Sequence, residues 1–150
     1  MAVIAGQFRR PRVLFCAEAV TLAHVARPVA LGSALAQAGY EVHLASHPRY
    51  DELLDDALPR RHYLESIPSE QFMDALSRGA PLYDEQTLSR YVDEDLLVIG
   101  EVKPEVIVGD MRLSLAVSSA IARIPYINIS NAYWSPYCRT RFVVPELPFT

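Results

Sequence analysis

His24 and Asp110 are the two side chains in this sequence best suited to moving a proton. His24 follows a predicted strand at residues 12–16, and Asp110 comes directly after another at 105–109. A carboxylate that orients a histidine ring makes it a general base toward a hydroxyl, since the ordinary imidazole pKa of about 6.5 lies near working pH. Both residues also have structural interpretations: a histidine bonded to backbone at a helix start, and an aspartate capping a following helix.

The elements that must bring these residues together alternate between strand and helix. The predicted strands cover residues 12–16, 41–45, 62–64, 105–109 and 125–129. The predicted helices run from about residue 24 to residue 38 and over 49–58, 69–77, 85–99 and 114–123. This alternation predicts an α/β fold, a Rossmann-like parallel sheet with helices on both faces.

The strand order decides whether His24 and Asp110 meet. In the common order 3-2-1-4-5, the switch point lies between the first and fourth strands, and ligands bind there beyond the carboxyl ends. The loop after the first predicted strand carries His24, and Asp110 follows the fourth. We therefore expect the two side chains to meet at this edge of the sheet.

Local signals set the expected helix ends. Pro28 suits a first helical turn, and Gly39 suits the left-handed position after a helix. Gly100 is expected to end the helix over residues 85–99. The inward side of the 69–77 helix is expected to carry Phe72, Met73 and Leu76.

Further ligand-binding candidates follow the second and fifth predicted strands. His47 comes after the second strand, and Asn131, Tyr133, Trp134 and Tyr137 come after the fifth. Aromatic walls suit sugar rings and flat aglycones, although these side chains equally suit a cover for the sheet. His43 is interpreted as a core residue and His62 as a surface residue.

Composition and missing motifs exclude several classes of function. The chain has 150 residues, 51% of them hydrophobic, and a net charge of −4, which favours one globular domain and argues against nucleic-acid binding. Two cysteines and no long apolar stretch predict a cytoplasmic protein without a transmembrane segment. Glycine-rich phosphate loops, a nucleophile elbow and a metal-ligand constellation are all absent, so neither a cofactor nor a metal is expected.

The order of several short segments resembles the N-terminal region of the two-domain GT-B glycosyltransferases. The resemblance is closest to their UDP-glycosyltransferase and macrolide-glycosyltransferase-like branch. It is carried by RVLFC at residue 12, TLAHVARP at 21, LAQAGYEV at 35, VIVGD at 106 and IPYIN at 124. Ala23 departs from the family, which commonly has glycine before the histidine.

This resemblance implies that the chain is an incomplete N-terminal, acceptor-binding domain over residues 1–150. A catalytic histidine would match His24, and its supporting aspartate would match Asp110. The reaction would be an inverting transfer from a nucleotide sugar, such as a UDP-sugar, to a hydroxyl of a small-molecule acceptor, without a metal. The donor would be bound by a C-terminal domain absent from this chain or by a partner chain, so this chain alone is expected to be inactive.

Two other hypotheses remain open from the sequence. The chain could be a stand-alone, non-catalytic protein that binds a small molecule or a partner chain. It could also be an unrelated hydrolase that uses His24, Asp110 and a serine. An exposed sheet edge in an incomplete domain would favour self-association, so a homo-oligomer is possible.

Overall fold

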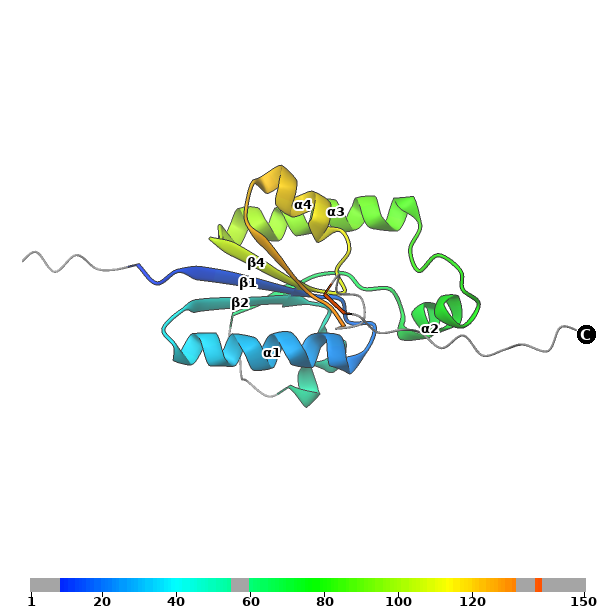
Figure 1. Cartoon of the computed structure of the whole chain (residues 1–150), viewed down its shortest axis with the longest axis horizontal. Helices are drawn as coiled ribbons and strands as arrows, with labels where there is room; N and C mark the ends of the chain where they lie inside the picture. Colours follow the sequence, from blue (N-terminus) through cyan, green and yellow to red (C-terminus); the bar gives the residue numbers. More distant parts are fainter. Residues whose placement is uncertain (1–8, 55–59, 132–136, 139–150) are drawn as a thin grey trace, which may run out of the picture.

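Five parallel strands form one sheet with helices on both faces in the computed structural model (Figure 1). The structure describes residues 9–54, 60–131 and 137–138. The strands are β1 (Arg12–Ala17), β2 (Glu41–Ser46), β3 (Arg61–Tyr63), β4 (Val106–Asp110) and β5 (Tyr126–Ile129). The helices are α1 (Leu22–Gln37), α2 (Ser69–Ser77), α3 (Glu85–Val102), α4 (Leu115–Ala122) and the 3₁₀ helix η1 (Pro48–Leu53). The predicted fold class is confirmed.

The strand order is β3-β2-β1-β4-β5, which places the switch point between β1 and β4 as expected. The register aligns the carboxyl ends of the central strands. Ala17 at the end of β1 lies opposite Ser46 of β2 and Asp110 of β4, and Asp110 lies opposite Ile129 of β5. The loops that leave these strands therefore emerge at one edge of the sheet.

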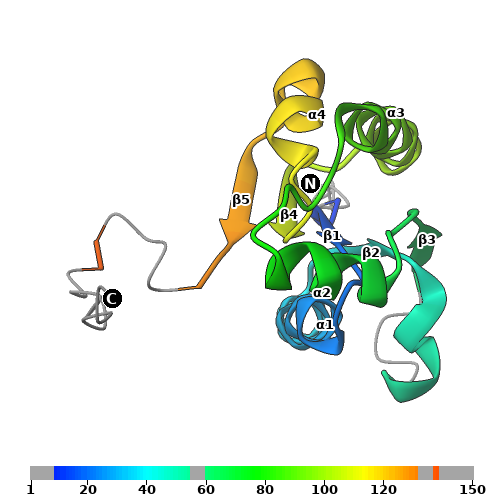
Figure 2. The same ribbon diagram turned by 90° about the vertical axis from the view of Figure 1, so that its right-hand side faces the viewer.

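Successive residues of β1 point to opposite faces of the sheet, and both faces are covered. Val13 and Phe15 pack with α1 residues on one face, whereas Leu14 and Cys16 pack with α3 and α4 on the other. Figure 2 shows α1 below the sheet and the pair α3 and α4 above it. Burial on both faces explains why β1 is almost continuously apolar in sequence.

A third apolar cluster lies beyond the carboxyl ends of the strands and holds α2 in place (Figures 1 and 2). Its buried members are Val20, Ile67, Phe72 and Tyr91. Phe72 and Ala75 are the buried residues of α2, whereas Met73 and Leu76 are 52% and 55% exposed. The expectation that Met73 and Leu76 lie on the inward side of this helix was therefore wrong. The face of α2 that packs against the rest of the fold is limited to Phe72 and Ala75.

The start of α1 also differs from the prediction. The helix begins at Leu22 after an extended Thr21, so His24 lies in its first turn rather than in the preceding loop. Pro28 lies inside the helix and is buried, not in its first turn. Its ring lacks the N–H that would bond to the carbonyl of His24, and burial against the sheet outweighs that loss.

Two more boundaries and one burial assignment were wrong. Gly100 does not end α3, which continues to Val102 and ends at Lys103 in a left-handed conformation, because buried Val98, Ile99 and Val102 hold the last turn. The helix expected over 49–58 is η1, and residues 55–59 lie outside the described part of the chain. The His62 side chain is only 13% exposed because it packs beside His43.

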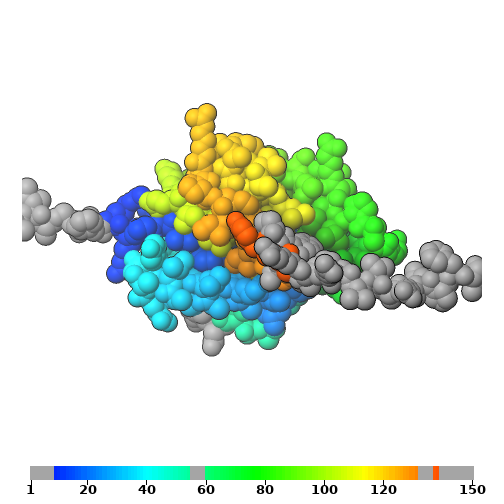
Figure 3. Space-filling view, in the orientation of Figure 1, coloured from blue at the N-terminus to red at the C-terminus, as the bar shows by residue number. Residues whose placement is uncertain are grey.

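The outer surface of α4 and β5 is partly apolar. Val117 and Ile121 of α4 and Ile127 of β5 are each more than half exposed. Among the described strands, β5 pairs only with β4, and no described strand lies along its other edge. Figure 3 shows α4 and β5 next to each other on one face of the molecule. None of the described helices has the length and apolar character needed to cross a membrane.

Gly109 of β4 is required by close packing on the α3 and α4 side of the sheet. A Cβ atom there would lie 2.5 Å from Cδ1 of Leu115 and 2.9 Å from the Tyr126 ring. We expect Gly109→Ala to lower the free energy of unfolding by about 1–3 kcal/mol, because Leu115 and Tyr126 must shift. Urea denaturation of the purified chain measures this difference.

Gly100 provides the matched control. A Cβ added there has no atom within 4 Å, and the residue lies inside α3. We expect Gly100→Ala to raise the free energy of unfolding by about 0.5–1 kcal/mol through helix propensity. Equal effects of the two substitutions would show that Gly109 is not closely packed.

Candidate active site

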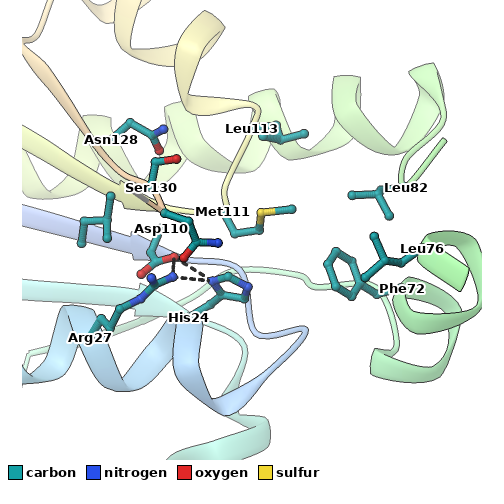
Figure 4. A pocket seen from close by; sticks show the side chains of 12 residues that line it. His24, Arg27, Phe72, Leu76, Leu82, Asp110, Met111, Leu113, Asn128 and Ser130 are labelled. Atoms are coloured by element: carbon teal, nitrogen blue, oxygen red, sulfur yellow. Dashed lines mark hydrogen bonds and ion pairs between the residues drawn. The ribbon is translucent and has the colours of Figure 1, made fainter. Parts of the chain in front are cut away.

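The structure brings His24 and Asp110 together at the switch point of the sheet (Figure 4). Nδ1 of His24 lies 2.8 Å from Oδ1 of Asp110. The aspartate side chain is 1% exposed, and the histidine side chain is 16% exposed. The histidine is held by the first turn of α1 and the aspartate by the last residue of β4, so both come from regular elements.

The acceptor-only chemistry of a carboxylate assigns the proton on His24. An ionised carboxylate has no hydrogen to give, so Nδ1 carries the hydrogen and donates it to Asp110. In the neutral ring, Nε2 is then unprotonated. This arrangement leaves an imidazole nitrogen that accepts a proton and a carboxylate that stabilises the resulting imidazolium.

Arg27 is a third member of this group that the sequence analysis did not identify. Its Nη2 donates to Oδ1 of Asp110 at 2.7 Å and lies 2.9 Å from Nδ1 of His24. Both donors therefore converge on one carboxylate oxygen. Oδ2 of Asp110 and Nε of Arg27 are buried without a hydrogen-bond partner among the described residues, so the ion pair uses one oxygen only.

The spacing between His24 and Arg27 in the sequence could have identified Arg27 as a member of this group. Residues three apart on a helix lie on the same face, so an arginine three positions after His24 reaches the same carboxylate. The guanidinium supplies the positive charge that a buried carboxylate requires. In the sequence, Arg27 stood out only as part of the family-like segment TLAHVARP.

The backbone turns sharply immediately after Asp110. Met111 has a φ of 60°, in the left-handed region that costs a residue with a side chain roughly 1–2 kcal/mol. The backbone N–H of Glu18 donates to the carbonyl of Asp110 at 3.0 Å, which ties the exit of β1 to the exit of β4. Such a conformation persists only where its surroundings fix it.

A pocket of about 250 Å³ opens beside the pair. Its polar side consists of His24, Arg27 and Asp110 together with polar residues of the end of β5 and the residues after it. Its opposite side is apolar and comes from α2 and the loops around it (Figure 4). The residues lining the pocket are His24, Arg27, Phe72, Leu76, Leu82, Asp110, Met111, Leu113, Asn128, Ile129, Ser130 and Asn131.

The other predicted ligand-binding residues fall in different places. Asn131 lines the pocket. His47 does not; its Nδ1 accepts a hydrogen bond from the backbone of Arg49 and caps η1. Tyr137 is 91% exposed and is not among the lining residues. Tyr133 and Trp134 lie outside the described residues.

Sequence reasoning also missed the apolar wall. Phe72, Leu76 and Leu82 face the His24 side of the pocket from α2 and the segment after it (Figure 4). The helix over 69–77 was predicted, yet its position depends on the third apolar cluster, which joins α2 to residues of the β1–α1 loop, the β3–α2 loop and α3. No pattern within α2 indicates that it lies beyond the sheet edge.

Cys16 and three serines at the start of and within α4 are engaged outside the pocket. Burial raises the pKa of the Cys16 thiol, with the Asp95 carboxylate adding to the effect, so Cys16 stays a neutral core residue. The hydroxyls of Ser114 and Ser118 donate to Asp95, and that of Ser119 donates to the carbonyl of Leu115. Within residues 9–54, 60–131 and 137–138, no group of three His, Cys, Asp or Glu side chains is arranged to hold a metal ion.

Two further histidines form a separate pair on β2 and β3. Nδ1 of His43 lies 2.9 Å from Nε2 of His62, and Nε2 of His43 lies 3.1 Å from Glu41. Nδ1 of His62 lies 3.6 Å from the Glu101 carboxylate. Neither histidine lines the pocket.

Comparison with known proteins places this chain beside bacterial glycosyltransferases. No family model matches the sequence. It is 51% identical over 142 residues to a PGL/p-HBAD biosynthesis rhamnosyltransferase of Mycobacterium bovis, covering 95% of this chain and 31% of that protein. It is 46% identical to a PGL/p-HBAD biosynthesis glycosyltransferase of Mycobacterium tuberculosis, covering 33% of it. A Mycobacterium bovis relative of the same identity, covered to 39%, is named inactive.

Solved structures of two glycosyltransferases share the fold of this chain. The spinosyn forosaminyltransferase matches with a TM-score of 0.58 at 22% identity, over 80% of this chain and 31% of that one. The glycosyltransferase SsfS6 of a Streptomyces species matches with a TM-score of 0.57 at 23% identity, over 79% and 39%. The chain spans between 31% and 39% of the curated relatives that it matches.

The partly buried pair of His43 and His62 predicts a pH dependence of stability. Burial lowers the pKa of His62 below its ordinary value, with Glu101 opposing and His43 adding to the decrease. The unfolded chain then binds this proton more readily than the folded chain. We expect the free energy of unfolding to decrease as the pH falls from about 6.5 through the folded pKa of His62.

The substitution His62→Gln isolates this contribution. We expect the variant to lose less of its free energy of unfolding than the native chain between about pH 7 and pH 5. Urea denaturation at a series of pH values measures both curves. Parallel curves for the two proteins would contradict the assignment.

Proposed function

We propose that this chain, a homologue of glycosyltransferases with the fold of the N-terminal part of a GT-B enzyme, is the acceptor-side part of an inverting glycosyltransferase. The whole protein would transfer a sugar from a nucleotide-sugar donor to a hydroxyl of a small-molecule acceptor. His24 would be the general base, and Asp110 would support it. The observation that carries this proposal is the 2.8 Å contact between Nδ1 of His24 and a buried carboxylate beside an open pocket.

The proposed step is a single displacement. Nε2 of His24 removes the proton from the acceptor hydroxyl as its oxygen attacks the anomeric carbon of the donor. The bond from that carbon to the nucleotide diphosphate breaks on the opposite side, and the diphosphate leaves with the electron pair. One displacement inverts the configuration at the anomeric carbon. Asp110 stabilises the imidazolium that forms and keeps the hydrogen on Nδ1.

The pocket supports the assignment of this part of the protein to the acceptor. It adjoins the proposed base directly, and its lining combines a polar side with an apolar side. Arg27 partly fills the polar side, where its guanidinium balances Asp110. An acceptor would lie with its hydroxyl toward His24 and its body against Phe72 and Leu76.

The donor would bind to a part of the protein that this chain does not contain. The chain spans about a third of the rhamnosyltransferase that it resembles. In a solved structure of the glycosyltransferase SsfS6, the protein is in complex with thymidine diphosphate, and this chain covers 38% of it. We propose that a C-terminal domain or a partner chain supplies the nucleotide-sugar site, and that residues 1–150 alone do not catalyse transfer.

A chimera tests the role of His24. In it, this chain replaces the matched segment of the Mycobacterium bovis rhamnosyltransferase. We expect the chimera to transfer sugar and His24→Ala to reduce its turnover roughly 10²–10⁴-fold, the typical contribution of a general base. Steady-state kinetics with the rhamnosyltransferase's own substrates measure the change.

The control for this substitution is His62→Ala. His62 lies on β3 outside the pocket, so we expect its loss to change turnover less than twofold. If the His24→Ala chimera has the same turnover as the His62→Ala chimera, His24 is excluded as the base. A chimera that binds donor but transfers no sugar would contradict the acceptor-side assignment of this chain.

The size of the native protein tests the expected domain organisation. We expect an antibody against residues 48–58 to detect a band well above 16.8 kDa on a denaturing gel of host extract, because we place the donor site first in a further domain of the same polypeptide. A band at 16.8 kDa would require a partner chain for transfer, or would favour the stand-alone, non-catalytic alternative.

A further inference from the structure

Arg112, two residues after Asp110, is completely buried and lies at the centre of a charged cluster outside the pocket. Its Nε donates to Asp95 at 3.0 Å and its Nη1 to Glu18 at 3.1 Å. The same Nη1 donates to the carbonyl of Glu65 at 2.5 Å, and Nη2 lies 3.4 Å from Glu94. The guanidinium carbon also lies 3.7 Å above the centre of the Tyr91 ring.

We call this group the Arg112 cluster; it comprises Glu18, Tyr91, Asp95 and Arg112. The side chains of Glu18 and Asp95 are not exposed to solvent, so two fully buried acidic groups share one guanidinium, which also lies near the partly exposed Glu94. Burial raises the pKa of Glu18 and of Asp95, and Arg112 opposes the rise in both cases. A buried charged group of this kind adds little to the free energy of unfolding, because apolar side chains of similar volume often stabilise a fold equally well.

The Arg112 cluster joins four segments that are distant in sequence. Tyr91 of α3 accepts a hydrogen bond from the backbone of Ile67 at 2.7 Å and donates to Glu18 at 3.2 Å. Ser114, at the start of α4, donates to Asp95 at 2.6 Å. The cluster therefore connects the β1–α1, β3–α2 and β4–α4 loops to α3.

Three consecutive residues, Asp110 to Arg112, connect this cluster to the carboxylate that supports the proposed base. Asp110 points toward His24, Met111 lines the pocket, and Arg112 points into the cluster. Glu18 fixes both ends of this tripeptide: its N–H donates to the Asp110 carbonyl, and its carboxylate accepts from Arg112. Met111 between them holds the unfavourable left-handed conformation.

We infer that Arg112 is a positioning residue, whose contacts with Glu18 and Asp95 hold Met111 in its left-handed conformation and thereby orient Asp110 toward His24. The inference rests on the proposed function and deepens it, because Asp110, the group that Arg112 orients, supports the proposed general base His24. Its geometric part, the orientation of the His24 ring, is measurable without any catalytic assay.

Nitrogen-15 NMR of the imidazole rings in the 150-residue chain tests this geometry directly. Long-range ¹H–¹⁵N correlations at about pH 8, where an ordinary histidine is neutral, identify which ring nitrogen carries the hydrogen. We expect native His24 to be in the Nδ1–H form. In Arg112→Lys, which keeps a charge but loses the planar fork, we expect a mixture of Nδ1–H and Nε2–H forms at His24 and unchanged signals from the other three histidines.

Arg78→Lys is the matched control, since Arg78 forms an exposed ion pair with Asp74 on α2. We expect this control to leave the His24 signals unchanged. A folded Arg112→Lys chain with a native His24 signal would overturn the inference. If Arg112→Lys does not fold, Asp95→Asn replaces it, because it keeps the shape of the cluster and removes one charge; the same two outcomes then decide.

A second variant tests the route through Met111. Asparagine tolerates the left-handed conformation better than methionine does. We expect Met111→Asn combined with Arg112→Lys to restore part of the Nδ1–H signal of His24. Failure of this restoration would contradict the role assigned to the Met111 conformation.

Kinetics of the chimera separate this inference from the proposed function. We expect Arg112→Lys to lower kcat roughly 10–100-fold with little change in KM, as a displaced catalytic group does. If His24→Ala retains full turnover, the proposed function fails, while the NMR result still decides whether Arg112 orients the His24 ring. An unchanged kcat in Arg112→Lys, beside a large loss in His24→Ala, would overturn the positioning role alone.

Discussion

The parallel pairing of β1 with β4 is the constraint on which the rest of the site depends. It places Ala17 opposite Asp110 and brings the loops after the two strands into contact. The Glu18 N–H then bonds to the Asp110 carbonyl, and the first turn of α1 places His24 beside the Asp110 carboxylate. Without this pairing, residues 86 positions apart in sequence have no reason to meet.

One carboxylate oxygen of Asp110 accepts hydrogen bonds from two different side chains. His24 and Arg27 both reach Oδ1, and Oδ2 has no hydrogen-bond partner among the described residues. The Arg27 guanidinium offsets the free-energy cost of burying the Asp110 carboxylate. It also competes with the His24 imidazole for the same acceptor oxygen. The orientation of the aspartate therefore matters as much as its presence, because a rotation of the carboxylate would change how it is divided between the two donors.

The turn after Asp110 connects the polar site to a second buried polar group. Asp110 points to His24, Met111 to the pocket and Arg112 to the cluster, and Met111 between the other two is left-handed. The Arg112 cluster lies where α3 and α4 meet the loops at the carboxyl edge of the sheet. It is thus placed to transmit the packing of the helices to the orientation of the proposed base.

The sequence by itself determined the alternation of strands and helices, because that alternation rests on the local hydrophobic pattern. The meeting of His24 with Asp110 was predicted from this pattern together with the common strand order of parallel sheets, and the structure has that order. Only the tertiary structure decided that α3 runs past Gly100, that α2 forms the apolar wall of the pocket, and that Arg27 and Arg112 converge on the carboxylates around the switch point. A glycine or an arginine has a local preference that the sequence displays. Its final role depends on burial and on partners far away in the chain, and a sequence read along its length does not contain those distances.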